Sequence, residues 1–546
     1  IEVDFPIAVV SKHSAREKAA PKGHPSMLHL WWARRPLAAC RAVLLGLLLP
    51  DPCDPHCPEE FRPKAREALR SVGNPGTTDE GLRKSILKFI GDFANWHNSS
   101  REVYLRAGRE LVKAAHPEET PLVVDPFAGG GSVPLEALRL GCDAFASDLN
   151  PVACLILKIM LEDIPRYGPE LADELRQAGN EIRDKAEKEL AEVYPKDPDG
   201  ATPIAYLWAR TVRCEAPNCG AEIPLARSFW LSKKANRKRA LRPRAVRPKG
   251  QPPRVEFEVF EPKNEKEVHG GTVARAKATC LCCGTVLPPE RVRAQLAEQR
   301  GGADVVFDAK GSRTGGARML AVVTLRDDEA GRHYRLPTDR DYDAVSKAQM
   351  QLIVVLDEWQ QTGTDGACPV PNESLPPIGT LGFRVQRYGM LEWGDLFTAR
   401  QKAALLALGT LVSSAELGSD HVQRLLACAL DRVAMSGMSC TRWNAVAEKM
   451  QHTFGRQALP IVWDFAEVVP TAKAPGNWQS GYEIAGDVVR EVSLPETGLV
   501  QQADATDHPL PHEAAGLWFT DPPYYDAVPY ADLSDFFYVW LRLPLR

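Results

Sequence analysis

Two short stretches that lie far apart in the sequence combine acids with glycine, proline and aromatic residues, and both could do chemistry. The first, Asp125–Ser132, reads DPFAGGGS, and its glycines would let a ligand approach the backbone closely. It joins an apolar run, 121–125, to a helical pattern, 133–140, and α/β sheets bind ligands where a strand ends and a helix begins. A second apolar run ends at Asp148, an acid that could accept hydrogen bonds from ribose hydroxyls. This order predicts a βαβ unit that binds a ribose-containing ligand; a turn whose glycines serve packing is the alternative. The glycine spacing is not that of dinucleotide sites, which argues against NAD.

The second stretch, Asp521–Tyr524, reads DPPY and follows the apolar run 517–519. Its two prolines hold a rigid turn and remove two N–H donors, so the carboxylate of Asp521 and the carbonyl of Pro522 have a fixed geometry. The ring of Tyr524 offers a face for stacking. Two acceptors beside an aromatic ring suit the exocyclic amino group of a base that has been rotated out of a helix. An ordinary proline-rich loop is the alternative, but the presence of both stretches in one chain favours a site.

Four cysteines have the spacing of a zinc ribbon, in which thiolates bind the metal and glycines let backbone N–H groups face the sulfur atoms. They are Cys214 and Cys219, followed by Gly220, and Cys280 and Cys283, followed by Gly284. The gap between the two pairs is long, Cys282 is an alternative ligand, and free thiols are the alternative to a metal. Cys53 and Cys57 could suggest a second metal site, but they lie among prolines, which favours an ordinary loop.

A basic stretch lies between the two cysteine pairs. It starts beside Phe229 and Trp230 and holds no Asp or Glu. Such a run would bind phosphates without sequence selectivity. A solvated face is the alternative, but the concentration of charge in a chain of net charge -4 favours contact with DNA. The basic residues are Arg227, Lys233, Lys234, Arg237, Lys238, Arg239, Arg242, Arg244, Arg247, Lys249 and Arg254.

The composition is that of an ordinary globular protein with several domains: 546 residues, 44% hydrophobic and 25% charged. The longest apolar run, around 42–49, is too short to cross a bilayer. Glu2 and Asp4 interrupt any secretory signal at the start, and thirteen scattered cysteines are not a disulfide scaffold. We therefore expect a soluble cytoplasmic protein without membrane contact.

Helical patterns are expected over 80–115, 168–198 and 398–436, and a strand over 516–520, whereas 51–75 has the composition of a loop and 300–395 has no clear pattern. We expect four parts. Residues 1–75 contribute to the ligand site, 76–160 and 496–546 form the α/β domain, 161–300 carry a helix and the cysteine-rich basic insert, and 301–495 form a mixed and then helical insert.

Together these motifs resemble the amino-group DNA methyltransferases that use S-adenosylmethionine (SAM). More closely, the chain resembles the large adenine-specific DNA methylases with a zinc ribbon and an N-terminal domain of unknown function. The resemblance implies an α/β fold: a Rossmann-like SAM methyltransferase sheet with a large α+β insertion that includes the zinc ribbon. The matching residues are Ser14–Lys18, Gly23–Pro36, Asp125–Ser132, Cys214–Lys234, Phe454–Gln457, Trp463 with Asp464, and Thr520–Trp540.

The resemblance also implies residue roles. Asp521 and Pro522 would accept hydrogen bonds from the target amino group, Pro523 would fix the turn, and Tyr524 would stack on the base. An Asp at the first position favours adenine N6 and leaves cytosine N4 open. The residues implied to contact SAM are Asp125, Pro126, Phe127, Gly129, Gly131, Asp148, Asn150 and Asp504.

The segment 23–36 is dense in aromatic and basic residues, and two interpretations stay open. It could close over the methionine end of SAM, as the resemblance implies, or it could be a packed helix with cation–π pairs. The residues concerned are His24, His29, Trp31, Trp32, Arg34 and Arg35.

The resulting hypothesis is a SAM-dependent enzyme that methylates adenine N6 in double-stranded DNA by base flipping. It would act in prokaryotic self-marking or phage defence, beside helicase or nuclease subunits. The alternatives are a non-catalytic nucleic-acid-binding component of a defence complex, and a methyltransferase for cytosine N4, RNA or protein. Residues 301–495 could read DNA, although no spacing singles out Lys449, Arg456 or Gln457. A SAM methyltransferase sheet usually has seven strands and the motifs place four, so we expect the others in a longer chain or a second polypeptide.

Overall fold

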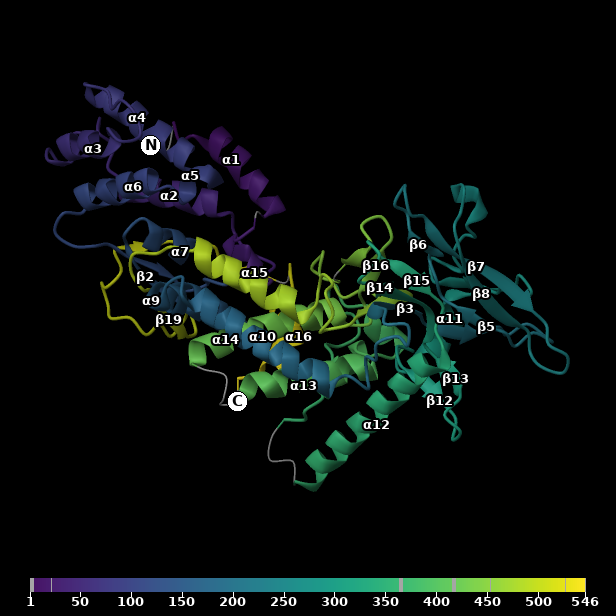
Figure 1. The fold of residues 1–546 in the computed structure, drawn as a ribbon. Helices are drawn as coiled ribbons and strands as arrows, with labels where there is room; N and C mark the ends of the chain where they lie inside the picture. Colours follow the sequence, from purple (N-terminus) through teal and green to yellow (C-terminus); the bar gives the residue numbers. More distant parts are fainter. Residues whose placement is uncertain are drawn as a thin grey trace. The chain divides into compact units, whose positions relative to one another are not determined.

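The computed structural model describes residues 4–20, 22–362, 367–414, 419–451, 453–525 and 527–545 (Figure 1). The chain divides into two compact units. Unit 1 comprises 1–177, 419–425 and 483–527, and unit 2 comprises 178–418, 426–482 and 528–546. This division differs from the four expected parts, because residues 528–546 belong to the same unit as the cysteine-rich insert. Four of the boundaries fall within or next to α10 (Leu171–Glu189), α14 (Asp420–Gly437) and α15 (Trp478–Glu491), and the fifth lies just before α16 (Tyr530–Leu541).

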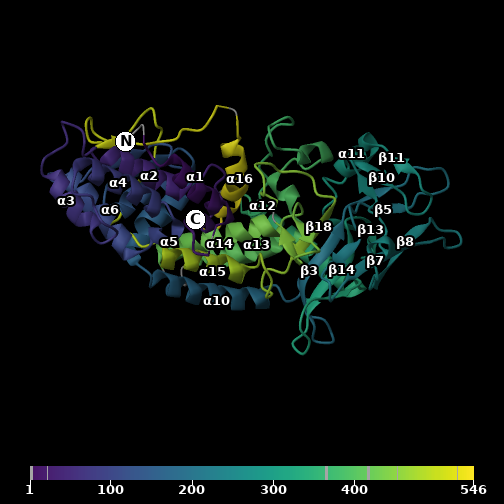
Figure 2. The same ribbon diagram turned by 90° about the horizontal axis from the view of Figure 1, so that it is seen from above.

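A bundle of helices begins unit 1, and Figures 1 and 2 show its members gathered together. The helices are α1 (Ile7–Arg16), α2 (Leu37–Leu48), α3 (Phe61–Leu69), α4 (Asp79–Phe93), α5 (Trp96–Ser99) and α6 (Glu102–Ala115). The α2 helix is apolar on nearly all sides because it packs against α1, α4 and α6 and also against α7 (Ser132–Arg139). Arg41 of α2 forms a fully buried ion pair with Glu136 of α7, at 3.2 Å. The bundle is therefore part of the body that carries the glycine motif.

Four parallel strands form the sheet of unit 1: β1 (Leu122–Asp125), β2 (Asp143–Asp148), β19 (Leu499–Gln502) and β20 (Leu517–Trp518). Their order is β19-β2-β1-β20. After β2, α8 (Pro151–Lys158), a π-helical turn (Ile159–Asp163) and α9 (Ile164–Tyr167) lead toward unit 2, and the chain returns to the sheet at β19. The expected strand–helix–strand unit and the long insertion after β2 are both present.

Unit 2 is built on antiparallel sheets, so the chain as a whole is a mixed α/β protein. Its largest sheet has the order β15-β14-β3-β18, with β3 (Thr202–Ala209), β14 (Arg318–Leu325), β15 (His333–Arg335) and β18 (Asp464–Val468). Glu467 of β18 is fully buried and accepts hydrogen bonds from Trp208 Nε1, Tyr194 and Arg400, at 2.7–2.9 Å. This network fixes the polar core of the sheet.

The remaining helices and strands complete unit 2. The helices are α11 (Pro289–Ala297), α12 (Asp339–Gln361), α13 (Ala399–Ser413) and α16 (Tyr530–Leu541). The strands are β4 (Thr211–Arg213), β5 (Glu222–Pro224), β6 (Trp230–Ser232), β7 (Arg239–Val246), β8 (Arg254–Phe260), β9 (Val273–Ala274), β10 (Lys277–Thr279), β11 (Val286–Leu287), β12 (Val305–Phe307), β13 (Arg313–Gly316), β16 (Arg442–Asn444) and β17 (Lys449–Gln451).

Several expected helices differ in extent from the structure. The pattern over 80–115 forms three helices, α4 to α6, and the stretch 51–75, expected as a loop, contains α3. The charged helix ends at Glu189 instead of 198. Segment 23–36 is a series of turns with one short 3₁₀ turn, Pro25–Met27, which excludes the packed-helix interpretation. Among the helices of the described residues, none is both long and apolar enough to span a bilayer.

Candidate functional site

The glycine motif and the DPPY motif lie at the ends of neighbouring parallel strands. The backbone N–H of Phe519 donates to the carbonyl of Val124 (3.1 Å), and the Thr520 hydroxyl donates to Asp125 Oδ1 (2.7 Å). The strand order reverses between β1 and β20, since the chain runs outward from β1 to β2 and β19 and then returns to the other side of β1. Open α/β sheets bind ligands at such a point, beyond the carboxyl ends of the strands. The sequence assigned no role to Thr520, although this residue directly precedes the DPPY motif.

The glycine loop, residues 125–132, is held by the acid at the end of the next strand. Asp148 accepts hydrogen bonds from the backbone N–H of Gly129 and of Asn150, both at 2.9 Å. Gly129 (φ +49°) and Gly131 (φ +76°) adopt the left-handed conformation, which glycine takes without strain. The loop therefore needs glycine at both positions for its backbone geometry.

Burial changes the acidity of both strand-end carboxyl groups. Asp125 is 3% exposed, and burial raises its pKa to about 6 despite hydrogen bonds from Thr520 and the N–H of Phe127. Burial also raises the pKa of Asp148, and the N–H donors of Asn150 and Gly129 oppose that rise. Perturbed acids that share a ligand-binding edge are typical of functional sites.

The other residues expected to contact SAM have different surroundings. Phe127 of the glycine loop is 41% exposed. Leu149, which was not among the expected residues, follows β2 and is 66% exposed. Asp504 follows β19 and is exposed, and it accepts hydrogen bonds from the N–H and hydroxyl of Thr506, which lower its pKa. The side chain of Asn150 accepts the N–H groups of residues 152 and 153 and caps α8.

The DPPY motif is open to solvent on unit 1. Pro522 and Pro523 are exposed, and the ring of Tyr524 is 75% exposed, so it is accessible for stacking. The carboxylate of Asp521 forms an ion pair with Arg35 of segment 23–36. Both partners are about two-fifths exposed, and such a surface pair is weak enough to be exchanged for another partner.

Segment 23–36 lies directly on the glycine loop. A Cβ atom added at Gly129 would be 2.4 Å from Trp31 Nε1, and one at Gly130 would be 3.1 Å from Arg34 Nε. The Ser132 hydroxyl donates to the carbonyl of Arg35 at 2.8 Å. Of the two interpretations, the structure supports a segment that covers the loop.

His24 and His29 belong to the same segment. His24 is buried against Trp96 and Glu17, and its Nδ1 accepts the N–H of Ser26. His29 Nδ1 is 3.0 Å from the carbonyl of Leu30.

The four cysteines come together in unit 2 in the arrangement of a structural metal site. The Sγ atoms of Cys214, Cys219, Cys280 and Cys283 all lie within 4.8 Å of one another, with closest pairs at 3.5 and 3.8 Å. A tetrahedral zinc ion with Zn–S bonds of about 2.3 Å requires sulfur atoms about 3.8 Å apart. Gly220 and Gly284 have φ of +63° and +79°, as expected for the turns after each pair. Cys282 does not belong to the cluster.

Burial and hydrogen bonds shift the acidity of these thiols in opposite directions. Burial raises the pKa of Cys214 to about 11, whereas hydrogen bonds from Thr285 lower the pKa of Cys283 to about 6. The backbone N–H groups of residues 282 and 283 stabilise the thiolate of Cys280, although burial raises its pKa overall. A metal ion would supply the positive charge that four neighbouring thiolates need.

The basic stretch forms β6, β7 and the turn that leads to β8, and glutamates of β8 and the residue after it balance part of its charge. Strand β7 pairs with β8 so that Arg242 faces Glu258 and Arg244 faces Glu256, at 3.1 and 3.3 Å. Arg239 also pairs with a glutamate, Glu261. These side chains are mostly exposed, and such pairs are weak, so the arginines remain able to exchange partners. The expected excess of positive charge is nevertheless smaller than the sequence count indicated.

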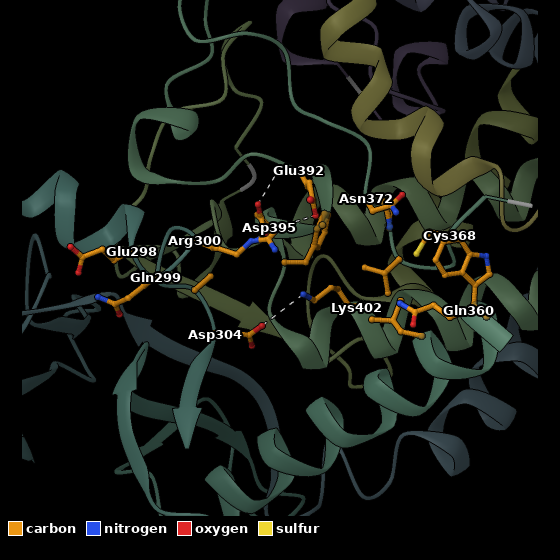
Figure 3. Close-up of a pocket in the computed structure, with 17 residues that line it drawn as sticks. Glu298, Gln299, Arg300, Asp304, Gln360, Cys368, Asn372, Glu392, Asp395 and Lys402 are labelled. Carbon is orange, nitrogen blue, oxygen red and sulfur yellow. Dashed lines mark hydrogen bonds and ion pairs between the residues drawn. The ribbon is translucent and has the colours of Figure 1, made fainter. Parts of the chain in front are cut away.

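Unit 2 also contains a cavity of about 640 Å³, shown in Figure 3. Its cations are already paired: Arg300 lies against Glu392 and Asp395, and Lys402 points toward Asp304. None of its lining residues is among those that the motifs single out, so this cavity is separate from the predicted chemistry.

Comparison with known proteins gives one match. Residues 4–71 match the family described as "Protein of unknown function (DUF1156)". The match covers helices α1 to α3 and segment 23–36, which confirms the expected N-terminal domain of unknown function. No curated protein and no solved structure matches the chain.

Proposed function

We propose that this chain is a SAM-dependent DNA methyltransferase that transfers a methyl group to adenine N6 in double-stranded DNA. The observation that carries the proposal is the hydrogen bond between Thr520 and Asp125. It holds a loop suited to a ribose-containing ligand next to a motif suited to an amino group. A methyl donor and an acceptor base must meet within bonding distance, and two adjacent strand ends provide for that meeting.

The residues at the strand edge fit the cofactor. The glycine loop brings bare backbone to the edge, and the exposed rings and chains of Phe127 and Leu149 offer apolar surface for an adenosine group. Asp148 has the position from which an acid holds ribose hydroxyls. Bound SAM would supply an electrophilic methyl group on sulfur.

The chain's own residues would act on the base. Asp521 and the carbonyl of Pro522 accept the two amino hydrogens, which favours a tetrahedral nitrogen with an available lone pair. Tyr524 stacks on the ring of the base and fixes its plane. This stacking offsets part of the free energy needed to open the base pair in the duplex. Arg35 must first release Asp521, which a weak surface ion pair permits.

We further propose that the cysteine cluster holds zinc in a structural role, and that the exposed arginines of the β7–β8 hairpin contact the DNA backbone. All four thiols belong to the protein, so the site would have no open position for substrate. Helicase or nuclease subunits of a defence system are the proposed partners.

Tritium transfer from labelled SAM to double-stranded DNA, RNA and protein tests the function. We expect transfer to DNA, reduced by about 10²- to 10³-fold in Asp521→Ala, as when one charge-stabilising group is removed from a reacting centre. Asp184→Ala, which removes an exposed acid of α10, should leave transfer unchanged. Transfer only to RNA or protein would reassign the substrate, and SAM binding without transfer to any of the three would favour the non-catalytic alternative.

A further inference from the structure

Arg34 carries a buried guanidinium group without an acceptor. Its Nη1 and Nη2 atoms have almost no exposed surface and no hydrogen-bond partner. The group lies on the glycine loop, with Nε 3.1 Å and Cζ 3.3 Å from the position of a Cβ at Gly130. It therefore sits where a ligand of that loop would place its atoms.

Other buried arginines of the described residues differ in having a partner for the charge, although Arg41 and Arg400 also keep nitrogen atoms without a hydrogen bond. Arg41 lies against Glu136, Arg400 against Glu467, and Arg210 donates to backbone carbonyls such as that of Val462. Burial without a partner is costly for a charged group, and proteins rarely keep one that has no function. Burial lowers the pKa of Arg34 to about 10, so the group still carries its charge at neutral pH.

We propose that Arg34 binds the carboxylate at the amino-acid end of the ligand seated on the glycine loop. This inference rests on the proposed function, in which that ligand is SAM. The planar fork of a guanidinium matches the two oxygens of a carboxylate. The domain matched by the family of unknown function would thus contribute a binding residue to the site.

The negative charge at the carboxyl ends of the strands favours a ligand with a single carboxylate over a polyphosphate. Asp125 and Asp148 lie beside the loop, and they would repel a ligand with several negative charges. A single carboxylate that belongs to an otherwise cationic ligand avoids this repulsion. Because the Nη atoms are enclosed, the carboxylate reaches them only when Arg34 changes rotamer.

The test compares two probes that differ in the amino-acid group. Calorimetry with the full chain measures binding of S-adenosylhomocysteine, which has the carboxylate, and of 5′-methylthioadenosine, which lacks it. In Arg34→Met we expect the first to bind about 10- to 100-fold more weakly, the loss typical of hydrogen bonds to a charged group, and the second to bind as before. Arg34→Lys should show a smaller loss, and Arg70→Met, on the exposed surface of the same domain, should show none.

A second readout separates this role from a structural one. Without ligand, Arg34→Met should raise the thermal midpoint, because it removes an unpaired buried charge. A lowered midpoint with equal losses for both probes would overturn the inference and leave the proposed function standing, as would unchanged binding of both probes. Failure of the unaltered chain to bind either probe would overturn the proposed function and this inference together.

Discussion

The substitution Asp125→Asn tests the electrostatic account of the strand edge most directly. Asp125 is buried, and its Oδ1 accepts from the hydroxyl of Thr520 and the N–H of Phe127. An asparagine oxygen can accept the same two hydrogen bonds in a side chain of nearly the same shape. The substitution therefore removes the charge and leaves the packing almost unchanged.

The expected magnitude follows from the pKa. Burial raises the pKa of Asp125 from 3.8 to about 6, so this carboxyl group binds its proton more tightly in the folded state than in the unfolded state. The stabilisation is complete below about pH 4 and is lost as the pH rises through 6. At about 1.4 kcal/mol for each tenfold change in the dissociation constant, the ionised carboxylate lowers the free energy of unfolding by about 3 kcal/mol at pH 8. Asp125→Asn should be more stable than the unaltered protein by up to this amount at pH 8, and by about half of it at pH 5.

Urea unfolding, monitored by hydrogen exchange of peptides that contain β1, would measure this difference in stability. Exchange of these peptides reports on unit 1 and not on the whole chain. Asp143→Asn, at the exposed start of β2, is the matched control for loss of an acid from the same sheet. A stability difference that does not change with pH, or a less stable Asp125→Asn at pH 8, would refute the reasoning.

Three further substitutions have definite expected outcomes. Gly129→Ala places a Cβ 2.4 Å from Trp31 Nε1 at a φ of +49°. The substitution should therefore destabilise unit 1 by at least about 1 kcal/mol and shift the tryptophan fluorescence. An unchanged fluorescence spectrum and an unchanged thermal midpoint would contradict this contact. Cys219→Ser should remove zinc measured by mass spectrometry of the purified protein and speed proteolysis between 211 and 297, whereas Cys282→Ser, outside the cluster, should retain the metal. Glu467→Gln leaves Arg400 buried without a counter-charge, so the free energy of unfolding of unit 2 should fall by about 3–5 kcal/mol in urea; a loss below 1 kcal/mol would show that the network is not needed.

The sequence predicted the local elements around the glycine loop well. The run 121–125 is β1, the pattern over 133–140 is α7, and the run ending at Asp148 is β2. Each of these is set by a few consecutive residues: an apolar run, an acid that ends it, and glycines that only a turn tolerates. The cysteine cluster could be predicted equally well, because metal ligation constrains the spacing within each pair of cysteines even when the pairs are far apart in the sequence.

Contacts between distant segments were harder to predict. Nothing in the spacing indicates that Trp31 lies on Gly129, since the approach depends on how α2 packs on α7. The charge balance of the basic stretch was hard to predict for a similar reason. Its neutralising residues begin at Glu256, just beyond it, and face the arginines only because β7 and β8 form a hairpin with a turn near Gly250. A glycine at that turn, between two strands of alternating charge, was the signal that could have revealed the pairing.

The charges at the strand edge explain why the N-terminal domain belongs to the same body as the sheet. All four parallel strands lead into an acid, namely Asp125, Asp148, Asp504 and Asp521. Such an edge by itself would repel the phosphates of a nucleic acid and would offer no cation to the carboxylate of a cofactor. Segment 23–36 brings Arg34 onto the glycine loop and Arg35 onto Asp521, so it supplies positive charge at the two places where the proposed reaction needs it. The buried ion pair between Arg41 and Glu136 then holds α2, which directly follows this segment, against the helix of the glycine motif. A chain that begins after residue 36 lacks these two arginines, and it should therefore fail to bind S-adenosylhomocysteine even where its sheet remains folded.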